Sequence, residues 1–131
     1  MSRTVILIDD DQDDLDVLID RIASVDATIR CISFQHPLEA MRAMLQDLIF
    51  FPDFIFTDIN MPELRGDHLV GELRKNEDFD NTIITVLSTS INPKTAELLR
   101  ELGANYVFEK PTRLKQYDTI FQQIFNPGSM L

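Results

Sequence analysis

The chain has 131 residues, and its formal net charge is −10. This acidic balance argues against non-specific binding to nucleic acids, which needs a basic surface, and against adsorption to anionic membranes. Hydrophobic residues make up 44% of the chain, which is enough for one domain with one core.

Five short apolar runs alternate with segments of helical periodicity along the chain. We interpret the runs as strands that cover residues 5–8, 29–34, 54–57, 83–87 and 106–108. They are almost continuously apolar, as expected when helices cover both faces of a parallel sheet. The alternation predicts an α/β fold, a (βα)5 doubly wound domain with a five-stranded parallel sheet.

The first two helices are predicted from caps and apolar spacing. Asp11 and Asp13 are candidate N-caps of the first helix. Its expected stripe is Leu15, Leu18, Ile19 and Ile22. Pro37 suits the first position of the second helix. The expected stripe there is Leu38, Met41, Leu45 and Leu48.

The third helix is predicted to begin at Leu64 or Gly66 and to end near Lys75. Asn92 with Pro93 is a start signal for the fourth helix. Its apolar stripe is Ala96, Leu99 and Leu102, and Gly103 closes it.

Thr112 is the expected cap of the fifth helix. The stripe of this helix is Leu114, Tyr117, Ile120, Phe121 and Ile124. The last residues, about 126–131, are predicted to form a flexible tail. We therefore expect a single domain over residues 1–131, with no output domain.

Charged and hydroxyl side chains follow four of the five predicted strands. Asp9 and Asp10 follow the first strand, Asp58 the third, Ser88 the fourth and Lys110 the fifth. The carboxyl ends of parallel strands meet at one edge of an open sheet, where such folds bind their ligands. The sequence therefore predicts a site at this edge.

The three carboxylates of Asp9, Asp10 and Asp58 would repel one another, and some would take up protons. A divalent cation would relieve this repulsion. Oxygen ligands and retained waters suit Mg²⁺, which seldom has a cage made of protein ligands alone. These three residues are therefore candidate metal ligands.

In this order the motifs resemble the receiver domain of bacterial two-component response regulators, the CheY-like proteins. The resemblance covers nearly the whole chain. It is carried by the acidic pair, the turn Asp58-Ile59-Asn60-Met61-Pro62, Gly66, Ser88 and Lys110-Pro111. It implies a flavodoxin-like sheet with strand order 2-1-3-4-5.

The resemblance also implies roles for these residues. Asp10, Asp58 and the backbone carbonyl of Asn60 would ligate Mg²⁺ or Mn²⁺, and Asp9 would act through a bound water. Asp58 would accept a phosphoryl group whose oxygens Lys110 and the Ser88 hydroxyl contact.

The implied partners are a sensor histidine kinase or phosphotransfer protein as donor and a separate, unknown protein target that reads the phosphorylated state. The chain would then be a signalling domain rather than an enzyme, apart from its own phosphorylation and dephosphorylation. DNA binding and membrane insertion are not expected. The start lacks the pattern of a signal peptide and no apolar run reaches transmembrane length, so we expect a cytoplasmic location.

Three positions affect how such a switch would work. Thr89 stands where the family favours a small residue, and we hypothesise that it slows autodephosphorylation. Val107, between Tyr106 and Phe108, stands where the family usually has a switching aromatic residue. Either Val107 simply packs and the loop after Ser88 carries the switch, or the output surface differs. The family usually has a cis bond before Pro111.

Other readings of the residues stay open. A haloacid-dehalogenase-like phosphatase would use Asp9 as its nucleophile. A non-phosphorylated interaction module on the same scaffold usually lacks part of the set of acidic residues and lysine, which this chain retains. The acidic residues 11–16 read best as a solvated helix start favoured by the helix dipole. Cys31 is expected to be a small core residue, and neither His36 nor His68 is assigned a role.

Overall fold

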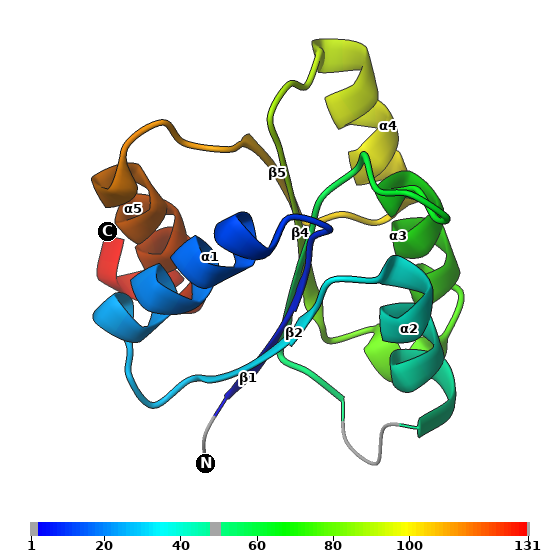
Figure 1. Ribbon diagram of the computed structural model, residues 1–131, viewed down its shortest axis with the longest axis horizontal. Coiled ribbons are helices and arrows are strands. Elements are labelled where there is room, and N and C mark those ends of the chain that lie inside the picture. Colours follow the sequence, from blue (N-terminus) through cyan, green and yellow to red (C-terminus); the bar gives the residue numbers. More distant parts are fainter. Residues whose placement is uncertain (1–2, 48–50, 131) are drawn as a thin grey trace.

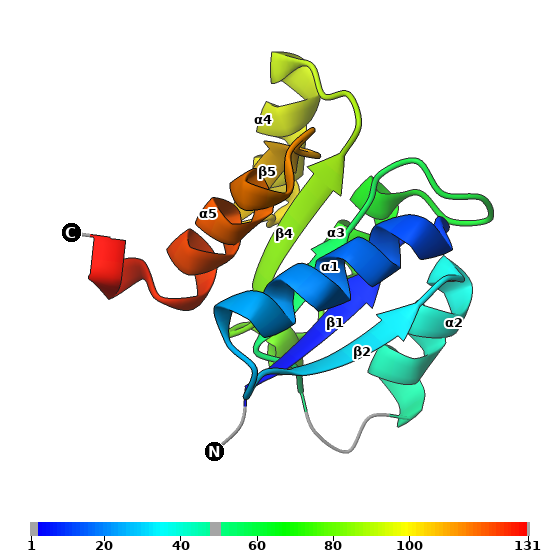
Figure 2. The ribbon, with the colours of Figure 1, turned by 60° about the vertical axis from the view of Figure 1, so that its left-hand side comes forward.

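A computed structural model describes residues 3–47 and 51–130 and contains a five-stranded parallel sheet. The strands are β1 (Thr4–Ile8), β2 (Arg30–Phe34), β3 (Phe54–Thr57), β4 (Ile83–Ser88) and β5 (Tyr106–Glu109). Their order is β2-β1-β3-β4-β5, and every neighbouring pair is parallel. The arrowheads of β1, β2 and β4 point the same way in Figure 2. The predicted fold class and strand order are confirmed.

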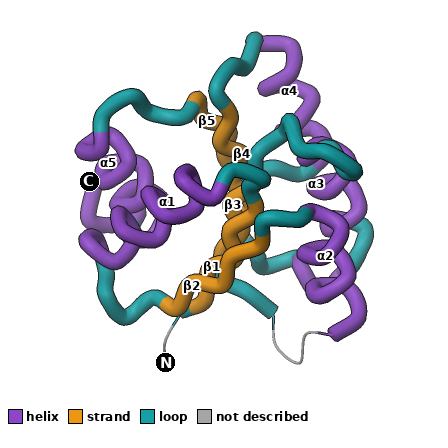
Figure 3. The backbone as a smooth tube through the Cα atoms, in the orientation of Figure 1, coloured by secondary structure: helices purple, strands orange, loops and turns teal. Residues whose placement is uncertain are grey.

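Helices cover both faces of this sheet (Figure 1). They are α1 (Gln12–Val25), α2 (Pro37–Arg42), α3 (Gly66–Arg74), α4 (Pro93–Leu102) and α5 (Leu114–Phe125). In Figure 3 the sheet is seen edge-on, with α1 and α5 on one side and α2, α3 and α4 on the other. None of the helices in the described ranges is long and apolar enough to cross a membrane.

The sheet separates two apolar clusters. Alternate residues of a strand point to opposite faces, so Ile6 belongs to the cluster under α2 to α4, and Leu7 belongs to the cluster under α1 and α5. Phe56 and Phe121 make an edge-to-face contact in the second cluster, with ring centroids 5.3 Å apart. Because both faces are covered, each strand carries apolar residues on both faces, which explains the continuous apolar runs of the sequence.

Several predicted caps are present. Asp11 is the N-cap of α1 and accepts hydrogen bonds from the backbone N–H groups of Asp13 and Asp14 at 2.9 and 3.4 Å. Asn92 caps α4 and accepts from the backbone N–H of Thr95 at 2.8 Å. Gly103 ends α4 at a φ of 121°, which favours glycine.

The predicted apolar stripe of α2 was wrong in part: Met41 packs against the core cluster, but its neighbours in the stripe do not lie in the core. Leu38 and Leu45 are 40% and 37% exposed, whereas Ala40 and Met44 are buried. Pro37, Ala40 and Met44 share the same helical spacing as the predicted stripe, and the small Ala40 can lie directly against the core. The helix also continues as a π-helical turn, η1 (Ala43–Asp47). The predicted stripe residue Leu48 lies outside the described residues.

The start of α5 also differs from the prediction. Arg113 rather than Thr112 is the N-cap, and its backbone N–H donates to the Gln116 side chain at 3.3 Å. Leu114 is 53% exposed because the packed part of the helix begins one turn later, at Tyr117. Beyond α5 the chain forms a short 3-10 helix, η3 (Pro127–Met130). The flexibility of the tail and the single-domain organisation stay predictions.

Candidate functional site

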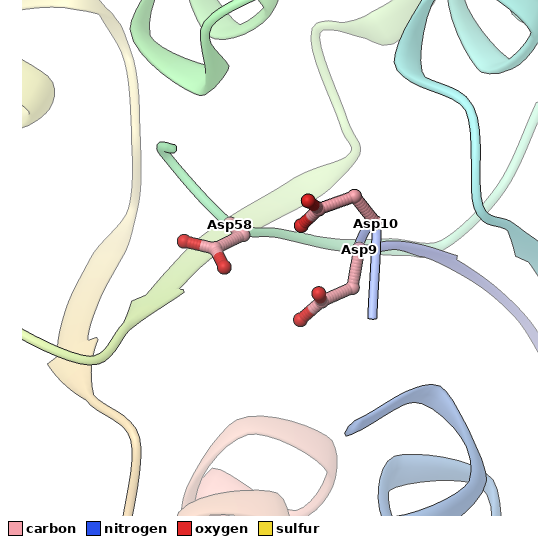
Figure 4. Close-up of side chains that lie close together, drawn as sticks. All are labelled: Asp9, Asp10 and Asp58. Carbon is pink, nitrogen blue, oxygen red and sulfur yellow. The ribbon is translucent and has the colours of Figure 1, made fainter. Parts of the chain in front are cut away.

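Three carboxylates meet at the carboxyl edge of the sheet. Asp9 and Asp10 follow β1 and Asp58 follows β3, and these strands are neighbours with Ile8 paired to Thr57. One oxygen from each carboxylate lies within 4.8 Å of the others. Figure 4 shows the side chains of Asp9 and Asp10 extending towards Asp58. Asp9 and Asp58 are buried and Asp10 is exposed, so the cluster opens to solvent on one side.

Backbone amides hold one oxygen of each buried carboxylate. The Oδ1 atom of Asp58 accepts from the N–H of Ile59 at 2.6 Å, and the Oδ1 atom of Asp9 accepts from the N–H of Asp11 at 3.0 Å. The backbone N–H of Asp58 in turn donates to the carbonyl of Ile8 at 3.1 Å. The orientation of both carboxylates is therefore fixed by the turns that follow their strands.

Lys110 binds the second oxygen of both buried carboxylates. Its Nζ donates to Asp9 Oδ2 at 2.8 Å and to Asp58 Oδ2 at 2.9 Å. A third hydrogen bond, also 2.8 Å long, goes to Asp14 Oδ2. Burial opposes the charge on Lys110, but the hydrogen bonds to Asp14, Asp9 and Asp58 outweigh it and raise the pKa of Lys110 above its ordinary value. Lys110 is therefore a fixed cation in the middle of the carboxylates.

Asp9 shows the electrostatic cost of this arrangement. Burial raises the pKa of Asp9 above its ordinary value, and the hydrogen bond from Lys110 only partly offsets the effect. A metal cation bound to the carboxylate oxygens would favour the ionised form of Asp9. Three close carboxylates, one of them open to solvent, fit Mg²⁺ or Mn²⁺ in their donor chemistry.

Asp14 is the site residue that our sequence interpretation missed. We assigned residues 11–16 to a solvated helix start, yet Asp14 contacts Lys110 and its side chain is only 35% exposed. One signal was available in the sequence. Asp14 lies four residues before Leu18, which belongs to the buried stripe of α1, so both lie on the same side of the helix.

Ser88 lies at the end of β4, and its backbone is joined to that of Lys110. The Lys110 backbone N–H donates to the Ser88 carbonyl at 2.8 Å. Ser88 is fully buried, and its Oγ has no hydrogen-bond partner within residues 3–47 and 51–130, a condition it shares with Thr85 Oγ1. An unpaired buried hydroxyl costs about 1–3 kcal/mol, so this group would gain from a ligand oxygen. Thr89, the next residue, is exposed.

The turn after Asp58 is packed closely against the start of α3. Asn60 is exposed, and its backbone N–H lies 3.4 Å from Asp58 Oδ1. Gly66 donates its N–H to the Ile59 carbonyl at 2.8 Å. A Cβ atom at position 66 would lie 2.0 Å from the Asp58 carbonyl oxygen. Only glycine fits there without moving the turn.

The predicted switch positions on β5 face different layers. Tyr106 packs with the cluster under α1 and α5, and Val107 packs with the cluster on the α4 side. Val107 also lines a surface pocket of about 260 Å³ with Ile91, Pro93 and Ala96. The packing is consistent with either interpretation of Val107. The described part of the chain has no cis peptide bond, so the bond before Pro111 is trans, whereas the family usually has a cis bond at this position. The trans isomer of such a bond is preferred by about 0.5–1 kcal/mol.

The remaining candidates stay outside the site. Cys31 is half-buried at the edge of the cluster under α1 and α5, and burial raises the pKa of its thiol, which disfavours the nucleophilic thiolate. His36 precedes α2 without a side-chain capping bond. His68 is exposed and lies 4.0 Å from Glu72.

Comparisons with known proteins agree with this fold. The model of the response regulator receiver domain matches residues 5–122. The structure superimposes on phosphorylated RcpA, a cyanobacterial phytochrome response regulator, with a TM-score of 0.84 and 23% identity, covering 95% of this chain and 91% of that one. For the Mn²⁺-bound form of response regulator Rcp1 the TM-score is 0.79 at 25% identity, covering 93% and 91% of the two chains.

The curated relatives match over shorter segments. A hybrid signal transduction histidine kinase D from Dictyostelium discoideum is 37% identical over 60 residues, which is 46% of this chain and 4% of the kinase. The matched segments span half or less of the length of these curated relatives, which include a stress response regulator from Candida albicans and response regulator Rcp1 from Synechocystis. The match over residues 5–122 shows that the chain belongs to the response regulator receiver domain family. It is thus a signalling domain of two-component systems, and the phosphatase reading is set aside.

Proposed function

We propose that this receiver accepts a phosphoryl group on Asp58 from a histidine kinase or phosphotransfer protein, in a reaction that depends on Mg²⁺. One observation carries the proposal. Asp58 lies with Asp9 and Asp10 in a cluster whose oxygens are within 4.8 Å, and the same carboxylate is 2.9 Å from the Lys110 ammonium. A nucleophile, a cation site and a fixed positive charge therefore share one edge of the sheet.

Asp9, Asp10, Asp58 and the backbone carbonyl of Asn60 would hold the metal ion. When bound, Mg²⁺ neutralises negative charge on the carboxylates and on the transferred group. The proposed ligand set combines carboxylates with a turn carbonyl, which suits an ion that keeps several waters.

The protein contributes mainly positioning and charge, as is usual in phosphoryl transfer. A carboxylate oxygen of Asp58 bonds to phosphorus while the bond from phosphorus to the donor imidazole nitrogen breaks, and that nitrogen keeps the electron pair. The N–H of Ile59 fixes the orientation of the Asp58 carboxylate at 2.6 Å. Lys110 then stabilises charge on one oxygen of the transferred group.

Ser88 provides the proposed link to a conformational change. Its buried Oγ, unpartnered among the residues we describe, would donate to a phosphoryl oxygen. Movement of Ser88 would shift the loop between β4 and α4, which begins with Thr89. Residues of this loop and of α4 line a pocket with Val107. Phosphorylation would thereby bias an existing equilibrium at the surface of α4, β5 and α5, which a separate protein reads.

The alternative is an interaction module that is never phosphorylated. The complete set of Asp9, Asp10, Asp58 and Lys110, with its contacts formed, argues against that reading. The downstream target, the absence of an output domain and a cytoplasmic location stay predictions.

The test is phosphorylation with Mg²⁺ and acetyl phosphate, followed by intact mass. We expect an adduct on the wild type that is absent from Asp58→Asn. An adduct lost mainly in Asp9→Asn, with Asp58→Asn still labelled, would move the nucleophile to Asp9. A folded wild type that gains no adduct, with small donors or phosphorylated kinase, would favour the interaction module.

A further inference from the structure

Asp14 is a fourth carboxylate at the site, outside the metal cluster. Its Oδ2 atom lies 2.8 Å from Lys110 Nζ, the same distance as Asp9 Oδ2. A lysine ammonium has three donors and no acceptor. With Asp9, Asp58 and Asp14 bound, all three donors of Lys110 are in use.

Phosphorylation of the free oxygen of Asp58, Oδ2, ends its bond with Lys110, because that oxygen becomes part of the acyl phosphate. Lys110 must then move to reach a phosphoryl oxygen, and this movement strains its bonds to Asp9 and Asp14. Asp9 is a poor candidate for release, because its side chain is 2% exposed and a backbone N–H holds its second oxygen. The Asp14 side chain is 35% exposed and can be rehydrated when it leaves. Asp14 is therefore the carboxylate whose release costs least.

We propose that Asp14 is a positioning residue that holds the Lys110 ammonium in its unphosphorylated position and competes with the phosphoryl group for that ammonium. The inference rests on the proposed phosphorylation of Asp58. Asp14 sits in the first turn of α1, where the helix dipole favours its negative charge. Phosphorylation replaces the single negative charge of the Asp58 carboxylate with the nearly two negative charges of an acyl phosphate, a net gain of about one charge beside Asp14. Both the competition and the repulsion oppose phosphorylation, so Asp14 makes the phosphorylated state of Asp58 less favourable.

The proposal predicts that removing the charge of Asp14 strengthens binding of a phosphoryl analogue. The probe is beryllofluoride with Mg²⁺, titrated against the whole chain and followed by NMR or calorimetry. Asp14→Asn is expected to bind it about fivefold more tightly than the wild type, the effect of one partly exposed charge-assisted hydrogen bond. Asp14→Glu, which keeps the carboxylate, is expected to stay within about twofold of the wild type.

Asp13→Asn is the matched control, because Asp13 lies in the same helical turn, is exposed and loses the same charge. Both asparagine variants are expected to bind Mg²⁺ alone with affinities within about twofold of each other. In a Lys110→Met background the difference between Asp14→Asn and Asp13→Asn is expected to fall to the smaller part that direct repulsion contributes. Such a double-mutant cycle isolates the Asp14–Lys110 pair from general charge effects and from stability.

Equal analogue affinities in Asp14→Asn and Asp13→Asn would overturn the inference, since general charge would then account for the change. Weaker binding by Asp14→Asn would also overturn it, because Asp14 would then hold Lys110 in its productive place. If the wild type bound no beryllofluoride at all, the proposed function itself would fail, a result distinct from the other two.

Discussion

Replacing Gly66 by alanine tests whether the proposed metal site depends on the close packing between the turn after Asp58 and the start of α3. The added Cβ would lie 2.0 Å from the Asp58 carbonyl oxygen and 2.8 Å from Ile59 Cα, whereas real Cβ contacts stay above 3.0 Å. Relief of the first clash requires the Asp58–Ile59 backbone and the start of α3 to separate by about 1 Å. A misplacement of about that size can reduce a rate on the order of 100-fold.

We expect the Gly66→Ala variant to stay folded but to lose about 1–3 kcal/mol of unfolding free energy, the usual cost of overpacking. Its phosphorylation by acetyl phosphate should fall by about two orders of magnitude, and its Mg²⁺ affinity should fall with it. Initial rates by intact mass, Mg²⁺ titration and urea unfolding measure the three quantities.

Gly71→Ala is the control within the same helix. A Cβ at position 71 would meet only Leu102 Cδ2, at 3.8 Å, an ordinary contact. This variant should be unchanged in metal binding and phosphorylation and be stabilised by up to about 1 kcal/mol through helix propensity. Phosphorylation of Gly66→Ala within about threefold of the Gly71→Ala rate would refute the reasoning.

Three further predictions concern other parts of the domain. Arg74 donates to three backbone carbonyls at 2.9, 2.6 and 2.8 Å, so Arg74→Met should cost about 3 kcal/mol in urea unfolding, against less than about 0.5 for the exposed control Arg100→Met. Thr89→Ala should speed hydrolysis of the phosphorylated protein several-fold, and an unchanged rate by mass spectrometry would contradict the role of Thr89. Hydrogen bonds from Thr28 lower the pKa of Asp26; this stabilisation is present above the ordinary pKa of 3.8 and lost as pH falls through the lower folded-state value. Thermal unfolding should therefore show Asp26→Asn less stable than wild type at pH 6, with the difference closing towards pH 2.

The strands and the cluster at their ends could be predicted because the sequence encodes them locally. Residues 54–57 were predicted and observed as the same strand, and a buried parallel strand has few alternatives when both neighbouring segments are helical. Once β1 and β3 are neighbours in register, Asp9 and Asp58 must lie side by side. A residue that directly follows one of these strands can therefore be placed at the site from its position in the sequence.

The rotation of a helix about its own axis, in contrast, could not be predicted from the sequence alone. In α2 two sets of residues have the same spacing, and the small Ala40 lies against the core in place of Leu38. In α1 a modest rotation decides whether Asp14 faces water or Lys110. Apolar periodicity defines a face about 100° wide, which is too broad to place a residue at its margin. Residues at such margins are therefore set by the volumes and charges of distant elements. Asp14 and Lys110 are 96 residues apart, so the hydrogen bond between them could not be predicted from a local sequence pattern.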